Sequence, residues 1–218
     1  MGSTFLEVSG NNDAQRFTYF TPRFSGFQVG ASYARDGNQD SNSQLDGDTG
    51  LRDIVDFGAN YVNSFGDFDV AVSGRYGFAD DHANSDPSVW SAGLTLGYSG
   101  FTVGGSYAEQ NGGDLKNGHS YDAGVSYETG PWGFSFTYFH GNNKGNGDVD
   151  ADDGTIIAEN GSEEQDQYLL GVNYKLAKGV SLGAFGAYVD FDDATSGEGG
   201  TDGSIDGFVL GTGVKLSF

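Results

Sequence analysis

Strict alternation of large apolar side chains with small or polar ones is the feature that most limits what this 218-residue chain can fold into. It is clearest over residues 208–218, where one set of alternate positions holds Phe, Leu, Val and a Thr, and the other holds Gly, Lys, Ser and a Val. Successive side chains of a β-strand point to opposite faces. The spacing therefore predicts a strand with one oily face and one polar face.

The same alternation recurs along the chain. It is clear at 27–34, 68–78, 90–98, 101–109, 120–128, 132–140, 167–176 and 180–189, and looser at 15–24 and 53–65. The connections alternate between turns of about two residues and long stretches rich in Asp, Asn, Gly and Ser, at about 36–52, 80–88, 110–119, 141–165 and 192–205. This pattern predicts about eleven strands in an all-β, antiparallel, up-and-down arrangement.

The composition indicates where such strands fold. With 38 Gly, 12 Tyr and 17 Phe the chain is too aromatic for a disordered protein, and no apolar run approaches the roughly 20 residues of a membrane helix. The polar strand faces are poor material for a packed core but suited to line water. Aromatic residues close the oily faces at the strand ends, as in the two girdles of a membrane barrel. The predicted girdle residues are Trp90, Tyr98, Tyr107, Tyr127, Trp132, Tyr138, Tyr174 and Phe218.

These features predict a single transmembrane β-barrel domain over residues 1–218. Bacterial barrels have even strand numbers, so the strand at 15–24 needs a partner before it. Either Thr4–Val8 forms a short twelfth strand, or a larger barrel is represented without its first strands; both remain open. No basic region followed by an apolar stretch opens the chain, so an exported protein would be present in mature or shortened form.

Two bulk properties exclude whole classes of function. A formal net charge of -21 argues against nucleic acid as a partner, because binding phosphates requires a basic surface. The absence of Cys excludes disulfide frameworks and thiolate metal sites.

Several stretches, in this order and spacing, resemble the general porins of alphaproteobacteria such as Rhodobacter. They are residues 16–33, 97–107, 121–133 and 213–218. The resemblance implies a trimeric, sixteen-stranded channel in the outer membrane of a Gram-negative bacterium. Its partners would be outer-membrane lipid, lipopolysaccharide and small hydrophilic solutes, which diffuse through passively. In that family a long acidic loop faces a basic cluster across the pore. The chain departs from the family at its front, where residues 1–14 are expected to be a remnant of that loop.

Strand parity predicts which charged side chains face the water-filled interior. These pore-lining candidates are Arg16, Arg75, Lys175, Lys215, Asp56, Asp69, Asp122 and Glu128. Arg16 and Arg75 are the best candidates for a basic wall. Arg23 has the opposite parity but lies near a turn, from which it can reach either headgroups or the mouth of the interior. Charges on such a wall either tune ion passage or only solvate it.

A weak calcium motif lies in the acidic stretch 148–159. Asp148, Asp150, Asp152 and Glu159 match positions one, three, five and twelve of a calcium loop, but the sixth position is Asp153 where Gly is needed. A solvated acidic loop is the simpler interpretation. No cofactor is required, and calcium is the only metal that the pattern suggests.

Other functions are less well supported. The three His residues have no metal-ligand or acid–base spacing, and no nucleophile elbow is present, so we expect no enzyme. The alternative to a channel is a structural or adhesive outer-membrane barrel whose acidic surface loops carry the function. A soluble calcium-dependent solenoid would repeat at a short fixed period, and none is found.

Overall fold

The computed structural model describes residues 14–37, 51–81, 85–112, 117–144, 162–193 and 204–217. Every regular element in these ranges is a strand. The strands are β1 (Arg16–Phe20), β2 (Phe27–Asp36), β3 (Leu51–Phe65), β4 (Phe68–Asp81), β5 (Ser88–Tyr98), β6 (Phe101–Asn111), β7 (Gly118–Thr129), β8 (Trp132–Lys144), β9 (Ser162–Ala177), β10 (Val180–Asp193) and β11 (Ile205–Leu216). Within these ranges no helix has the length and apolar character needed to cross a membrane.

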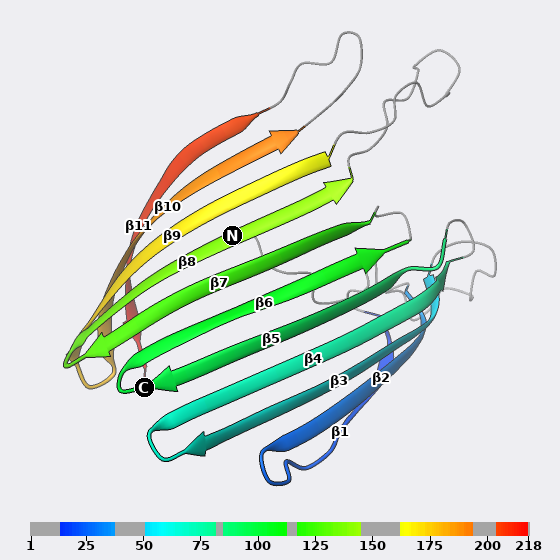
Figure 1. The fold of residues 1–218 in the computed structure, drawn as a ribbon, viewed down its shortest axis with the longest axis horizontal. Helices are drawn as coiled ribbons and strands as arrows, with labels where there is room; N and C mark the ends of the chain where they lie inside the picture. Colours follow the sequence, from blue (N-terminus) through cyan, green and yellow to red (C-terminus); the bar gives the residue numbers. More distant parts are fainter. Residues whose placement is uncertain are drawn as a thin grey trace. The chain divides into compact units, whose positions relative to one another are not determined.

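The strands form one sheet in chain order, β1 to β11, so each strand pairs with its neighbours in sequence (Figure 1). The predicted all-β, antiparallel, up-and-down arrangement is thereby confirmed. By contacts the chain divides into two compact units, one of residues 4–94 and 106–120, the other of residues 1–3, 95–105 and 121–218. We describe each unit by itself, and the prediction of a single domain stays a prediction.

Tight turns join alternate strand pairs. Ser99 and Gly100 both have positive φ, 50° and 85°, as in the type I′ turns that match the twist of a hairpin. Gly130 precedes Pro131 with a φ of 54°, which suits the first central position of a type II′ turn. The predicted turns at Gly66, Ser99, Gly130 and Lys178 all separate consecutive strands as expected.

In each unit the sheet has two faces. The face to which the aromatic and aliphatic residues of each strand point is called the apolar face, and the opposite one is called the polar face. Large side chains of the apolar face are exposed even on interior strands: Phe57 is 52%, Val103 53% and Phe134 47% exposed. A water-soluble domain would cover such a surface, so these strands are built to meet a non-protein apolar phase.

The first strand is shorter than predicted. The pattern suggested residues 15–24, but β1 ends at Phe20 and only an isolated bridge between Phe24 and Phe27 resumes the pairing. Pro22 lies in the gap, and proline has no N–H to donate to a ladder. The expected twelfth strand at Thr4–Val8 lies outside the described residues.

The polar face of the first unit is partly packed, contrary to the prediction that this face forms no core. Ala34, Ile54, Ala79 and Val89 are at most 2% exposed and form one buried cluster with Ala14. Ala14 lies two residues before β1 and packs on the polar face. Sequence periodicity could not show this, because the covering comes from a non-strand segment.

The polar face of the second unit is also more apolar than predicted. Cross-strand partners there include Leu169 with Ala187, and Ala187 with Val209. Val209 is 51% exposed. We expected this face to hold only small and polar residues. The expectation fails on β10 and β11, because consecutive residues there, such as Phe208 and Val209, are apolar and therefore place apolar side chains on both faces.

Candidate functional site

The best-defined polar cluster lies on the polar face of β1 to β4. Asp56, whose side chain is 9% exposed, accepts hydrogen bonds from Arg75 Nη2 at 2.6 Å and Nε at 3.2 Å. Arg16 Nη1 lies 3.5 Å from the other carboxylate oxygen and 3.4 Å from Ser32 Oγ. Two guanidinium groups thus share one carboxylate.

Strand register explains why these residues meet. Asp56 pairs with Ser32 on β2 and with Gly77 on β4, and Gly58 pairs with Arg75. All therefore share a face. Parity predicted the face of Arg16, Arg75 and Asp56; it did not predict that they pair with one another, nor that Ser32 joins them.

A hollow of about 290 Å³ opens beside this cluster. Arg16, Thr18, Phe20, Ser32 and Arg75 contribute to its lining. Phe20 is 64% exposed, and the Cδ1–Cε1 edge of its ring lies where a Cβ of Gly30 would be, at 2.5 and 2.6 Å from that position. An aromatic ring thus stands on the polar face and lines the same hollow as the two arginines. In the sequence, the only signal was that Phe20 follows Tyr19 and so breaks the alternation.

Arg23 lies at the turn end of the polar face. Its Nη1 donates to the Gly26 carbonyl at 2.7 Å, and its Nη2 donates to Asn60 Oδ1 at 2.6 Å and Gln28 Oε1 at 3.2 Å. Gln28 and Asn60 are polar-face partners in the ladder of β2 with β3. The side chain lies against the polar face, where its hydrogen bonds link the turn to β2 and β3; whether it lines the mouth of a pore stays a prediction.

The remaining predicted pore-lining residues are dispersed. Lys175 Nζ lies 2.8 Å from Glu128 Oε2, and both side chains are more than half exposed, so this pair is screened by solvent. Asp69 accepts a hydrogen bond from Ser64 Oγ at 2.5 Å near a turn. Lys215 and Asp122 lie on the polar face by strand parity. The part played by each of these residues in a pore stays a prediction.

The aromatic residues of the apolar face form files across neighbouring strands. Ring centroids of Tyr138 and Tyr168 are 5.0 Å apart, and those of Tyr188 and Phe208 are 4.9 Å apart. A second file lies near the short turns, where Trp132 packs on Tyr174 at 4.7 Å. The predicted girdle residues Trp90, Tyr98, Tyr107, Tyr127, Trp132, Tyr138 and Tyr174 all lie in strands, whereas Phe218 lies outside the described residues.

One His is paired through space in a way that sequence spacing could not reveal. His140 Nδ1 lies 3.1 Å from Asp166 Oδ1, which also accepts a hydrogen bond from the Tyr138 hydroxyl at 2.5 Å. The three side chains lie on the apolar face at the end of the strands opposite the short turns. We interpret them as polar side chains that end the row of aromatic residues on the apolar face.

The calcium candidates Asp148, Asp150, Asp152 and Glu159 lie outside the described residues. Within the described ranges, no group of three or more His, Cys, Asp or Glu residues is arranged to hold a metal ion.

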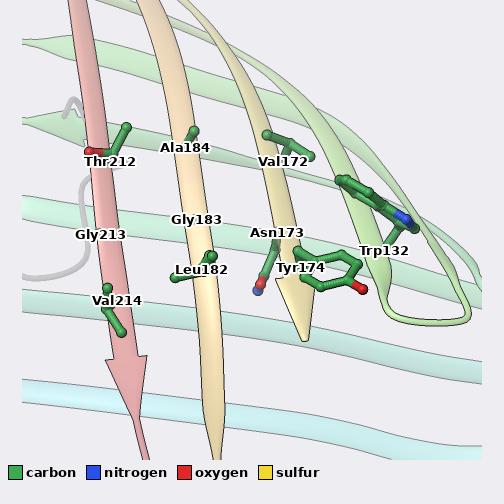
Figure 2. A pocket seen from close by; sticks show the side chains of 10 residues that line it. All are labelled: Trp132, Val172, Asn173, Tyr174, Leu182, Gly183, Ala184, Thr212, Gly213 and Val214. Atoms are coloured by element: carbon green, nitrogen blue, oxygen red, sulfur yellow. The ribbon is translucent and has the colours of Figure 1, made fainter. Parts of the chain in front are cut away.

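A second hollow, of about 540 Å³, lies on the apolar face of β8 to β11 (Figure 2). Its lining combines large side chains, such as Trp132 and Tyr174, with small residues, such as Gly183 and Gly213. Its lining includes Trp132, Tyr174, Leu182, Ala184, Thr212 and Val214. It offers no charged side chain, so we assign the candidate site to the polar face.

Comparison with known proteins identifies relatives of the same architecture. A family model described as Gram-negative porin matches residues 1–194. No curated protein matches the chain. An anion-selective porin from Comamonas acidovorans is 19% identical, with a TM-score of 0.55 over 96% of this chain and 64% of that one. The trimer form of OmpT, an outer membrane protein of Vibrio cholerae, is 17% identical, with a TM-score of 0.56 over 100% and 70%.

A third structure, OccAB4 of Acinetobacter baumannii, is 14% identical, with a TM-score of 0.58 over 91% of this chain and 52% of that one. At these identities the likeness concerns the fold alone. The chain spans less than two thirds of the length of the Comamonas and Acinetobacter proteins, and 62% of a loop-deleted form of the Vibrio protein.

Proposed function

Because the chain belongs to the Gram-negative porin family, we propose that it forms a channel for passive diffusion of ions and small hydrophilic solutes. Members of this family are located in the outer membrane of Gram-negative bacteria. The observation that carries the proposal is that the strands expose an apolar face, while the opposite face of β1 to β4 bears the Arg16–Asp56–Arg75 cluster. Only a water-filled interior accommodates such a charged wall at low cost.

The cluster places two guanidinium groups and one carboxylate on that wall. Asp56 contacts both guanidinium groups and so helps to position them. Both guanidinium groups are partly exposed, with Arg75 29% and Arg16 27% accessible. An anion near this wall is attracted and a cation repelled, which gives weak selection by charge.

We also propose the partners that the family suggests. One structural relative is a trimer, and a homotrimer is our expectation here. Outer-membrane lipid and lipopolysaccharide are expected to cover the apolar face, and an origin among alphaproteobacteria is the resemblance we favour. Calcium binding by residues 148–159 and the absence of enzymatic activity stay predictions.

Planar-bilayer recording of the full chain tests the channel. We expect discrete conductance steps from protein folded in detergent. Folded protein without any steps would overturn the proposal and favour the structural or adhesive alternative.

Charge selection has its own test. Arg75→Gln removes one positive charge from the wall, so we expect the chloride-to-potassium permeability ratio to fall by up to about fivefold. That is the Boltzmann factor of roughly 1 kcal/mol for a unit charge at close range in water. Lys178→Gln, in the turn between β9 and β10, is the matched control and should leave the ratio unchanged. A ratio that is equal in both variants would show that the cluster does not select ions.

A further inference from the structure

The hollow of about 540 Å³ on the apolar face of β8 to β11 lies where one cross-strand row has short side chains. Ala184 of β10 pairs with Val172 of β9 on one side and with Thr212 of β11 on the other (Figure 2). Pockets that hold small ligands have volumes of about 300–1,000 Å³, so the hollow is large enough for a part of one. Because its lining belongs to the exposed apolar face, the part that enters it must be apolar.

The next row toward the short turns holds larger side chains with polar tips. Trp132 pairs with Tyr174, and Tyr174 pairs with Leu182. The centroids of the Trp132 and Tyr174 rings are 4.7 Å apart, and Figure 2 shows both rings at the edge of the hollow. Tryptophan and tyrosine favour the boundary between hydrocarbon and lipid headgroups. The hollow therefore lies at the hydrocarbon side of that boundary, near the short turns.

The apolar face of these strands meets opposite charges at its two ends. Lys178 is exposed in the turn that joins β9 to β10, four residues beyond Tyr174. At the other end Asp166, Asp190 and Asp206 face one another in a single cross-strand row. Among the described residues of β8 to β11, the apolar-face positions between the hollow and the short turns carry no carboxylate. Charge complementarity therefore favours an anionic headgroup at the short-turn end and disfavours it at the other.

We propose that the hollow binds an acyl chain of an anionic phospholipid from the leaflet on the short-turn side. The chain packs over Ala184, between the side chains of β9 and β11, and the headgroup lies at the level of the turn. Lys178 carries its ammonium group on a flexible stem, which suits a phosphate at that level. Trp132 Nε1 and the Tyr174 hydroxyl are further donors near it. This inference rests on the proposed membrane channel and adds a specific lipid to it.

Fluorescence quenching at Trp132 tests the site in the full chain. Trp90 is the other of the two tryptophans, so Trp90→Phe leaves Trp132 as a single reporter. The protein is folded into phosphatidylcholine vesicles in which part of the lipid is replaced by phosphatidylglycerol or phosphatidylcholine with brominated acyl chains. Bromine quenches an indole that it contacts, so the two headgroups are compared at one position. We expect phosphatidylglycerol to bind about three- to fivefold more tightly, the contribution of one lysine near an anionic lipid surface.

Four variants in this single-tryptophan protein separate the headgroup from the chain. Lys178→Gln should make the two lipids equal, and Ala184→Phe, which places a ring in the hollow, should lower quenching by both. Two matched variants serve as controls and should keep the quenching and the preference. Lys215→Gln removes a cation from the polar face, and Ala123→Phe adds a ring to the apolar face of β7, outside the hollow.

The outcomes distinguish the lipid site from the channel. In protein that conducts in planar bilayers, equal quenching by both lipids, or a preference that survives Lys178→Gln, would overturn the anionic-lipid site and leave the channel standing. Quenching by neither lipid in conducting protein would show that another copy of the chain covers the hollow, which also overturns the site. Folded protein that does not conduct would overturn the channel, whatever the quenching.

Discussion

Asp56 is the residue on which the candidate site depends. Its carboxylate is almost fully buried and accepts hydrogen bonds from both arginines and from Ser32. Hydrogen bonds to a charged group contribute about 1.5–3 kcal/mol each in favourable settings, and less where the donors are partly solvated, as they are here. Without the carboxylate, two like charges would stand side by side on one face.

Asp56→Asn should therefore destabilise the first unit by about 1–3 kcal/mol, and it should raise the anion preference of the channel because it removes a negative charge from the wall. Urea unfolding in detergent, followed by the mobility shift of unheated samples on a gel, measures the first effect; reversal potentials measure the second. Asp69→Asn, with a single hydrogen bond at an exposed site, is the control. Equal unfolding midpoints for the two variants would contradict this account.

For individual residues, strand parity predicted the face on which a side chain lies, but residue type did not predict its partners. It assigned Arg16, Arg75 and Asp56 to one face because the side-chain period of a strand is fixed. It could not pair them, because pairing depends on the register between β1, β2, β3 and β4, which no single strand encodes. Phe20 shows the same limit: its exposure on the polar face depends on Gly30 of another strand.

At the scale of elements, the short turns explain why the strands pair in order. Gly100 has a φ of 85°, and a Cβ there would lie 2.5 Å from the Glu128 carbonyl oxygen of the neighbouring β7. Gly66 has a φ of 64° but nothing within 4 Å of the same position. A side chain at Gly66 would therefore meet only backbone strain, whereas a side chain at Gly100 would meet backbone strain and a steric clash.

Gly66→Ala should cost about 1 kcal/mol, the penalty of a left-handed conformation for a residue with a Cβ. Gly100→Ala should cost more, about 2–4 kcal/mol, because the carbonyl contact adds to that penalty. The difference between the two midpoints of urea unfolding is the measurement. If Gly100→Ala proves as mild as Gly66→Ala, the turn must move away from β7 at little cost.

Element boundaries were predicted well where alternation and turn glycines agree, as from β5 through β8. They were wrong at β1, where Pro22 interrupts the ladder although apolar side chains continue. The strands also extend beyond the predicted ranges at their ends opposite the short turns, since Asp, Asn and Glu there still pair across the ladder, as in β9 and β10.

At the scale of the whole molecule, the alternation of short and long connections predicts a sidedness. Short turns are expected on the periplasmic side and long connections outside. Because the chain has no Cys, single cysteines report position without background.

Ser85→Cys, in the long connection between β4 and β5, should react on intact cells with a polyethylene-glycol maleimide too large for the pore. Lys178→Cys, in the turn between β9 and β10, should react only after the cells are opened. Labelling of Lys178→Cys alone on intact cells would reverse the assigned orientation.

The sequence by itself determined the fold class, the order of the strands, the division of side chains between two faces and the membrane environment, because period two and turn chemistry are local properties of the chain. The tertiary structure alone decided which polar side chains meet: Asp56 with two arginines, Lys175 with Glu128, and the ring of Phe20 with the gap at Gly30. It also showed Ala14 packed on the polar face, where a uniform wall was expected. Such contacts depend on cross-strand register and on non-strand segments, and neither leaves a periodic signal in the sequence.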